Sequence, residues 1–395
     1  MEPEQALSLL QAAGLPALDR RLLDGFALPM LRQLAAQRRD DVRLPLLALN
    51  GPVGVGKSSL GRVLEALAPA FELRLMVASI DDLYLPWPER QRLLAGNPFG
   101  VSRVPPGSHD LDLLLAGLAS WRQSGVLRLP RFDKTLVQGQ GDRSGWRQGA
   151  CDALVLEGWL LGCQALGEEG LAMAIGASDL SRPGPDGAPA LKPPELDWLE
   201  TWDRQLAAYG PLWQACDGLW VLRPLSWTLP RRWRFQAEAR QRHRGGGWLP
   251  AAELEQLVRS SLCSLPPLLY QDPLVASWMG SLDATRTGDA QLDWSGLSRD
   301  SGEMEGPVAD ASGAPAGQAL TFQAITALDR PQPIWPIGAE PHNHGPLGEV
   351  PTAPTKPGLV LQGLAVLDGR RRCVAIQHRH CRAQDSLSDS SSLIG

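Results

Sequence analysis

The sequence predicts an α/β protein whose mostly parallel β-sheet carries helices on both faces. Short apolar runs recur along the chain, and their lack of polar alternation suits strands that are buried on both faces. Stretches with helical periodicity separate these runs, which is the arrangement that successive parallel strands require. The apolar runs are residues 44–50, 74–80, 153–156 and 218–222.

The segments between these runs predict how the chain is divided. Leucines at helical spacing predict a helical N-terminal segment over residues 1–43. The main α/β domain then extends over residues 44–294. Within it, residues 167–194 are rich in proline and glycine and are expected to form a loop that interrupts the sheet. The helices of this domain are expected at residues 58–67, 111–121 and 195–209.

Beyond about Trp294 the sequence loses both strand and helix periodicity. The chain of 395 residues contains 41 Gly and 34 Pro, and this excess crowds toward the C-terminus. A segment of such composition buries too little apolar surface to offset the entropy lost on ordering. Residues 295–395 are therefore expected to be a low-complexity, disordered tail.

Composition and charge restrict the possible partners. The formal net charge of -5 offers no general attraction for nucleic acid or anionic membranes, so a polyanion site must be a local basic patch. No apolar run approaches the roughly 18 residues that span a bilayer, and the first residues are acidic, unlike a secretory signal. The six cysteines form no Cys-x-x-Cys pair, which favours reduced thiols. A soluble, cytoplasmic protein without a membrane partner is expected, and its oligomeric state is left open.

A phosphate-binding loop is the clearest motif in the chain. Residues 51–58 fit the pattern G-x-x-x-x-G-K-[ST] and lie between a predicted strand and a predicted helix. Glycines let backbone N–H groups surround phosphate oxygens, Lys57 adds a positive charge, and the Ser58 hydroxyl can bind Mg²⁺. The motif predicts ATP and Mg²⁺ as cofactors. The alternative is that the residues form a glycine-rich turn that matches the pattern by chance. The expected nucleotide-binding residues are Gly51, Gly54, Val55, Gly56, Lys57, Ser58 and Ser59.

Acidic residues follow two further predicted strands. Asp81 and Asp82 come directly after residues 74–80, and Glu157 ends another apolar run in the manner of a Walker B strand. Ligands gather at the carboxyl ends of strands in open α/β sheets. A kinase acting on an alcohol needs one carboxylate to accept the hydroxyl proton and others to hold Mg²⁺. Asp81 and Asp82 could instead cap a helix. Ser58 and Glu157 are the predicted metal ligands.

A cationic cluster is predicted near the same edge of the sheet. Arg131, Asp133 and Lys134 end another predicted strand, and Arg143 follows closely. Cations at this edge would suit an anionic acceptor. The alternative is a solvated loop that contains a structural ion pair.

Residues 227–262 are predicted to be mainly helical, with a basic first half that runs into three glycines. An arginine-rich helix with a glycine hinge is typical of a lid that closes over transferring phosphoryl groups. A nucleic-acid patch and a solvated face are the alternatives. Arg231 and Arg234 are expected to contact the nucleotide. The arginines of this segment are Arg231, Arg232, Arg234, Arg240, Arg242 and Arg244.

Together these motifs resemble the D-glycerate 3-kinases of plants and cyanobacteria, relatives of phosphoribulokinase, uridine kinase and pantothenate kinase. The resemblance covers about residues 44–282. It departs from the family at Leu83 and Ser108, where Phe and Thr are usual, and residues 167–194 resemble an insertion. Besides the phosphate loop, it is carried by Ser79-Ile80-Asp81-Asp82-Leu83-Tyr84, Asn97-Pro98, Pro106-Gly107-Ser108-His109-Asp110, Pro130-Arg131-Phe132-Asp133-Lys134, Gly141-Asp142-Arg143, Leu156-Glu157-Gly158-Trp159 and Trp233-Arg234-Phe235-Gln236-Ala237-Glu238.

The resemblance implies a P-loop NTPase fold and the MgATP-dependent phosphorylation of D-glycerate to 3-phospho-D-glycerate. Asp81 takes the position of the catalytic base, and Lys57 and Glu157 complete the catalytic set. One alternative is a related kinase acting on pantothenate, uridine or a ribulose phosphate. Another is a non-enzymatic ATP switch that binds nucleic acid, but a switch needs no paired acids beside an acceptor pocket. The expected acceptor-binding residues are Asp82, Tyr84, His109, Arg131, Asp133, Lys134 and Arg143.

Overall fold

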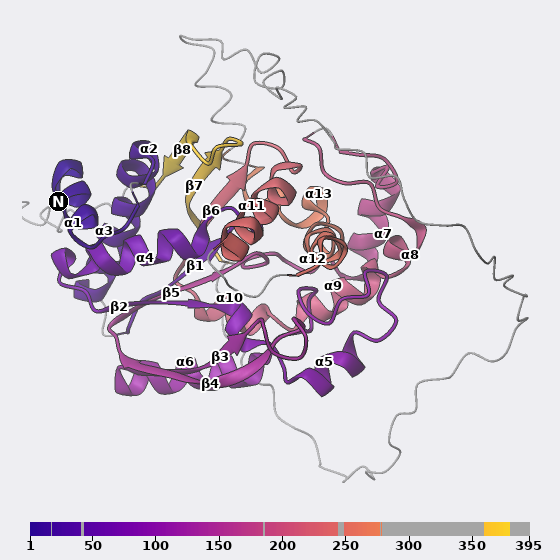
Figure 1. The fold of residues 1–395 in the computed structure, drawn as a ribbon, viewed down its shortest axis with the longest axis horizontal. Helices are drawn as coiled ribbons and strands as arrows, with labels where there is room; N and C mark the ends of the chain where they lie inside the picture. The colour runs from indigo at the N-terminus through magenta and orange to yellow at the C-terminus, as the bar shows by residue number, and fades with distance from the viewer. Residues whose placement is uncertain are drawn as a thin grey trace, which may run out of the picture. The chain divides into compact units, whose positions relative to one another are not determined.

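The computed structural model describes residues 1–16, 18–40, 43–184, 186–243, 249–276, 278 and 359–379. Its strands are β1 (Leu46–Asn50), β2 (Leu75–Ser79), β3 (Val126–Asp133), β4 (Asp142–Ala150), β5 (Ala153–Gly158), β6 (Gly218–Pro224), β7 (Leu361–Leu367) and β8 (Cys373–His378). One sheet has the order β2-β5-β1-β6-β7-β8 (Figure 1). Its first five strands in this order are parallel, and β8 is antiparallel to β7. β3 and β4 form a separate antiparallel pair.

Helices cover both faces of the six-stranded sheet because successive side chains of a strand point to opposite faces. In β1, Leu47 and Leu49 join a buried cluster with α1, α3 and α4, whereas Leu46 and Ala48 join a second cluster with α6, α9 and α12. The fold class predicted from the sequence is thereby confirmed. The helices are α1 (Pro3–Ala12), α2 (Arg20–Leu22), α3 (Leu28–Asp40), α4 (Lys57–Leu67), α5 (Trp87–Leu93), α6 (Leu111–Ser124), α7 (Gly167–Ala177), α8 (Pro193–Asp197), α9 (Leu199–Ala207), α10 (Gly210–Ala215), α11 (Leu229–His243), α12 (Ala251–Cys263) and α13 (Pro267–Tyr270).

Two local predictions need correction. Residues 167–194 were expected to form a loop, but their first part, Gly167–Ala177, is the helix α7. Antiparallel β4 was not predicted, since its sequence has no apolar run and most of its residues are exposed or half-buried. None of the helices in the described ranges combines the length and apolar character needed to cross a bilayer.

The expectation of a disordered tail is wrong for residues 359–379. β7 pairs with β6 along the sheet, and β8 pairs with β7. The side chain of Leu364 is fully buried, and Gly363 lets the ring of Trp220 approach so closely that an added Cβ would lie 2.1 Å from it. The Gly- and Pro-rich composition of the surrounding sequence conceals two short strands, of which β7 is mostly buried and β8 mostly half-buried in the assembled sheet. Residues 295–358 and 380–395 lie outside the described residues.

We predict that Leu364→Ala lowers the free energy of unfolding by about 2–5 kcal/mol, because it leaves a cavity in a fully packed site. Urea denaturation measures this loss. Arg370→Ala, an exposed change in the turn between β7 and β8, is the matched control and should have little effect. Equal stabilities for the two variants would show that β7 does not pack into the core.

Candidate active site

The phosphate loop, residues 51–58, connects the end of β1 to the start of α4. Gly54 and Gly56 have left-handed backbone conformations, with φ of +77° and +113°. A Cβ at Gly54 would also lie 2.7 Å from the backbone nitrogen of Arg234 in α11. Glycine is therefore required at Gly54 both by its φ angle and by the close approach of another helix.

Lys57, Ser58 and Glu157 meet at the start of α4. The register between β1 and β5 places Glu157 beside the phosphate loop. The Ser58 hydroxyl donates to Glu157 Oε1 at 2.8 Å, and Lys57 Nζ lies 3.7 Å from Glu157 Oε2. Lys57 Nζ also donates to the carbonyl of Gly51 at 2.7 Å, and burial lowers the pKa of this amine. The Lys57 ammonium therefore lies where it can donate both to loop carbonyls and to a bound phosphate.

The donor atoms beside the phosphate loop fit a magnesium ion. The Ser58 hydroxyl and the Glu157 carboxylate are hard oxygen ligands that already touch each other. Proteins usually hold Mg²⁺ through one or two such ligands, with water and phosphate oxygens completing the octahedron. A pair of oxygen donors next to a phosphate loop therefore suffices for a Mg²⁺–nucleotide complex.

Asp81 lies in a short 3-10 helix, Ile80–Leu83, directly after β2. The Tyr84 hydroxyl donates to its Oδ1 and the Lys134 ammonium to its Oδ2, each at 2.9 Å. Burial alone raises the pKa of Asp81, but the charge and hydrogen bond of Lys134, with Tyr84, bring it well below the ordinary value. The residue that caps this 3-10 helix is Ser79, so the capping role considered for the two acids is wrong.

Asp82 has a different environment from that of Asp81. Its Oδ1 accepts a hydrogen bond from the backbone N–H of Phe132 at 3.3 Å. Burial raises the pKa of its carboxyl, and the neighbouring Asp81 charge adds to this. This contact joins the 3-10 helix to β3 and places Asp82 in a supporting position beside Asp81.

Three predicted acceptor-binding residues have partners within the fold. Arg143 forms an ion pair with Asp110 at 2.7 Å, and Asp133 accepts two hydrogen bonds from Thr135 in a local turn. His109 is buried, with its Nδ1 2.6 Å from the hydroxyl of Tyr209. These contacts match the structural alternative left open for Arg143 and Asp133, and the acceptor role of all three residues stays a prediction from the sequence.

The structure also does not bring Arg131 to a cavity. Its side chain is exposed on β3, and it is absent from the lining of the cavities beside the phosphate loop and Lys134. Tyr84 is buried and acts through Asp81. Of the predicted acceptor set, Lys134 is the residue that both lines a cavity and contacts the proposed base.

The cavity at Lys134 has a volume of about 200 Å³. Arg103 and Arg234 line it together with Lys134, so three cations face a small space, and one of them contacts Asp81. Arg103 precedes the Pro-Gly-Ser-His-Asp segment but was not predicted as a site residue. The remaining lining residues are Thr135, Gln138, Gly139, Glu238, Gln241, Leu249 and Pro250.

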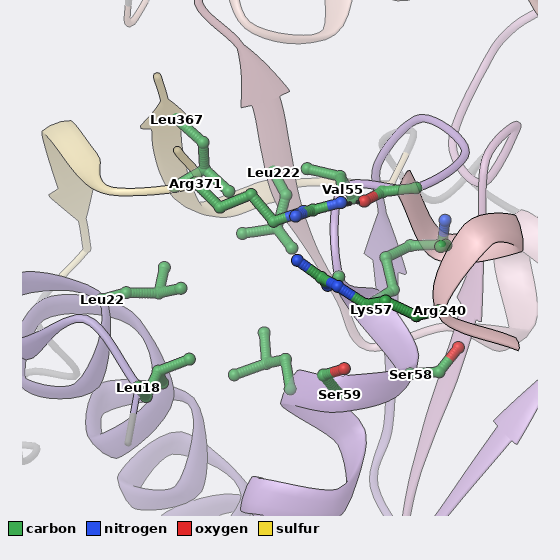
Figure 2. Close-up of a pocket in the computed structure, with 14 residues that line it drawn as sticks. Leu18, Leu22, Val55, Lys57, Ser58, Ser59, Leu222, Arg240, Leu367 and Arg371 are labelled. Atoms are coloured by element: carbon green, nitrogen blue, oxygen red, sulfur yellow. Dashed lines mark hydrogen bonds between the residues drawn. The ribbon is translucent and has the colours of Figure 1, made fainter. Parts of the chain in front are cut away.

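A second cavity, of about 310 Å³, lies over the phosphate loop. Figure 2 shows the side chains of Arg240, from α11, and Arg371, from the turn between β7 and β8, in this cavity together with Lys57. Leu22 and Leu367 are among its apolar lining residues. Neither arginine forms an ion pair with a carboxylate of the described residues. The cavity thus offers unneutralised cations beside an apolar wall, as a nucleotide requires.

Neither Arg240 nor Arg371 was predicted to contact the nucleotide, and Arg371 lies in the segment expected to be disordered. Its Nε donates to the carbonyl of Gly54 at 3.0 Å, and its Nη2 donates to the carbonyl of Trp233 at 3.3 Å. The signal that could have found it is the dipeptide Asp368-Gly369 between two apolar runs, which is a strong hairpin pattern. The low-complexity interpretation of the tail hid this pattern.

The arginines of α11 serve different partners. Arg231 contacts Glu255 of α12 at 2.7 Å and is absent from the lining of the cavity over the phosphate loop, whereas Arg240 lines it. The nucleotide contact of Arg231 stays a prediction. Trp233 is fully buried and fixes the first half of the helix against the phosphate loop. Arg244 and the three glycines lie outside the described residues, so the hinge predicted there is not tested.

The parallel sheet, the loop between β1 and α4, and the acids after β2 and β5 are the features of the P-loop kinase fold. No family model matches the chain. The chain is 28% identical over 251 residues to the chloroplastic D-glycerate 3-kinase of Arabidopsis thaliana, a match that covers 59% of this chain and 50% of that protein. The chain thus spans about half the length of this relative. It is 27% identical over 220 residues to the uncharacterized kinase mug58 of Schizosaccharomyces pombe, covering 53% of this chain and 75% of that protein.

Two solved structures share the fold. The D-glycerate 3-kinase of Cryptococcus neoformans matches with a TM-score of 0.57 and 19% identity, over 89% of this chain and 99% of that one. The YGR205w protein matches with a TM-score of 0.55 and 18% identity, over 90% of this chain and 97% of that one. These likenesses confirm the predicted P-loop fold.

We predict that buried His109 makes the protein less stable in mild acid. Burial lowers its pKa from 6.5 to about 4, so between these values the unfolded chain binds a proton that the folded chain does not. The free energy of unfolding should therefore fall by about 3 kcal/mol from this residue as pH drops through that window. Urea denaturation across the window should show a smaller fall for His109→Gln. His243→Gln, at the exposed end of α11, is the control, and an unchanged fall in His109→Gln would contradict the assignment.

Proposed function

We propose that the protein is an ATP-dependent kinase that transfers the γ-phosphoryl group to the 3-hydroxyl of D-glycerate. The observation that carries this proposal is the cavity lined by Arg103, Lys134 and Arg234, which adjoins Asp81 through Lys134. Such a cavity suits a small acceptor that has a carboxylate at one end and a hydroxyl at the other. The similarity to the Arabidopsis D-glycerate 3-kinase supports this choice of acceptor.

The nucleotide would occupy the cavity over the phosphate loop. Lys57 and the loop N–H groups would hold its phosphates, and Arg240 and Arg371 would add charge from the opposite side. Ser58 and Glu157 would hold Mg²⁺, which neutralises charge on the phosphates when bound. In-line transfer of the γ-phosphoryl group then requires the acceptor hydroxyl to lie opposite the bond to ADP and to face the γ-phosphorus.

Asp81 would orient the acceptor hydroxyl and accept its proton as the new P–O bond forms and ADP departs. Its low pKa makes it a weak base, but in a loose transition state the proton leaves late, so orientation matters more than basicity. An acceptor carboxylate near Lys134 would compete for this ammonium and free one oxygen of Asp81. The base would then be released by the substrate on which it acts.

The arrangement favours a kinase over a nucleic-acid-binding switch. Arg231 and Arg234 of α11 contact Glu255 and Glu238, and Arg240 faces the nucleotide cavity. These arginines therefore do not present one free basic face to a polyanion. A cytoplasmic location stays a prediction from the sequence.

We expect MgATP and D-glycerate to yield ADP and 3-phosphoglycerate. A coupled ADP-release assay across D-glycerate, pantothenate, uridine and ribulose 5-phosphate tests the acceptor, and phosphorus NMR of the product tests the position of the ester. Lys57→Ala should abolish transfer in a folded protein, because it removes the charge on the phosphates. A 2-phosphoglycerate product, or no stimulation by D-glycerate, would overturn the proposal.

We expect Asp81→Asn to lower kcat by about 10²-fold or more and to leave the KM for ATP nearly unchanged, since general-base assistance contributes roughly 10²–10⁴-fold. Asp82→Asn is the matched comparison and should lower kcat less, because its carboxylate supports β3. Steady-state kinetics with both substrates distinguishes the two variants. The opposite order of effects would make Asp82 the base.

A further inference from the structure

Arg103 is a buried cation that the described residues leave without a carboxylate partner. The residue is only 4% exposed, and its Nη1 donates to the carbonyls of Gly139, at 2.9 Å, and Gln140. No carboxylate in the described ranges lies within ion-pair distance of its guanidinium. Removing a charge from water is costly unless an opposite charge or a full set of hydrogen bonds replaces the water.

A comparison with Arg90 shows that the environment of Arg103 is incomplete. Arg90 is fully buried, and all three of its nitrogens donate to carbonyls, among them those of Leu85 and Gly141. Its guanidinium also lies 4.9 Å from the ring centre of Phe132, and it lines neither cavity of the site. Arg90 is thus satisfied by the fold, whereas Arg103 has a single donating nitrogen and faces a cavity.

We infer that Arg103 is the residue that binds the carboxylate of the acceptor and selects for it. This inference rests on the proposed function and assigns one end of the substrate. Lys134 lines the same cavity and reaches Asp81, so a carboxylate at Arg103 directs the rest of a small molecule toward the base. The volume of about 200 Å³ is below the roughly 300–1,000 Å³ of pockets for drug-sized ligands, which suits a short hydroxy acid.

Arg234 lines the same cavity but is already engaged. Its Nη1 lies 2.7 Å from Glu238 Oε2, while Glu238 Oε1 accepts the backbone N–H of Leu249 at 2.8 Å. A substrate carboxylate must compete with Glu238 for Arg234, but it meets no such competitor at Arg103. Arg103 is therefore the main binding residue for the acceptor carboxylate, and Arg234 contributes less.

The test compares Arg103→Gln with Arg128→Gln, which changes an exposed arginine of β3 that lines neither cavity. Losing a charge-assisted hydrogen bond should raise the KM for D-glycerate about 10- to 100-fold and leave the KM for ATP within about twofold. Arg103→Lys keeps a charge but not the planar fork, so it should give a smaller rise. Thermal unfolding of each variant checks that it folds, and Arg103→Lys carries the test if Arg103→Gln does not fold.

Activity with glycerol distinguishes a carboxylate-binding role of Arg103 from a purely structural role. Glycerol keeps the hydroxyls of glycerate and lacks the carboxylate, so Arg103→Gln should lower kcat/KM for D-glycerate while leaving kcat/KM for glycerol nearly unchanged. The preference of the wild-type enzyme for D-glycerate over glycerol should shrink by the same 10- to 100-fold. A parallel loss on both substrates would show that Arg103 only supports the fold.

The outcomes separate this inference from the proposed function. If the wild-type protein phosphorylates D-glycerate and Arg103→Gln has the KM of Arg128→Gln, the assignment of Arg103 is overturned and the function stands. If the wild-type protein shows no ADP release with D-glycerate, the proposed function falls, and the inference falls with it. A raised KM specific to the carboxylate substrate supports both.

Discussion

The site depends on the close contact between the phosphate loop and two segments that follow it far along the chain. The backbone of α11 comes so near Gly54 that no side chain fits between them, and Arg371 binds the carbonyl of the same glycine. Trp233 fills the space behind this contact, and its indole donates to the carbonyl of Gly369. The shape of the nucleotide cavity is therefore set by α11 and by the β7–β8 turn as much as by the loop itself.

The charges of the site are arranged so that the fold alone does not neutralise them. Arg240 and Arg371 line the cavity over the phosphate loop, and Arg103 lines the cavity at Lys134, each without a carboxylate partner among the described residues. In contrast, Lys57 of the first cavity is paired with Glu157, and Lys134 of the second is paired with Asp81. Each cavity therefore combines a lysine that is paired with an acid and an arginine that is open to an anionic ligand.

β7 and β8 connect the end of the chain to this arrangement. β7 extends the parallel sheet beyond β6, and the turn that follows it carries Arg371 to the phosphate loop. β7 is an apolar strand with one glycine, Gly363, which allows the ring of Trp220 to pack against it. The side chains of β7 are buried because the strand pairs with β6 inside the sheet.

The sequence alone determined the parallel α/β fold, the phosphate loop and the acids Asp81 and Glu157, because these follow local patterns of burial and turn geometry. The hairpin pattern at Asp368-Gly369 was also present in the sequence, although the Gly- and Pro-rich composition of the surrounding segment concealed it. Only the tertiary structure decided which cations face the cavities. Arg143 is paired with Asp110, whereas Arg103 has no carboxylate partner in the described part of the chain, and this difference depends on packing between segments that no local pattern records.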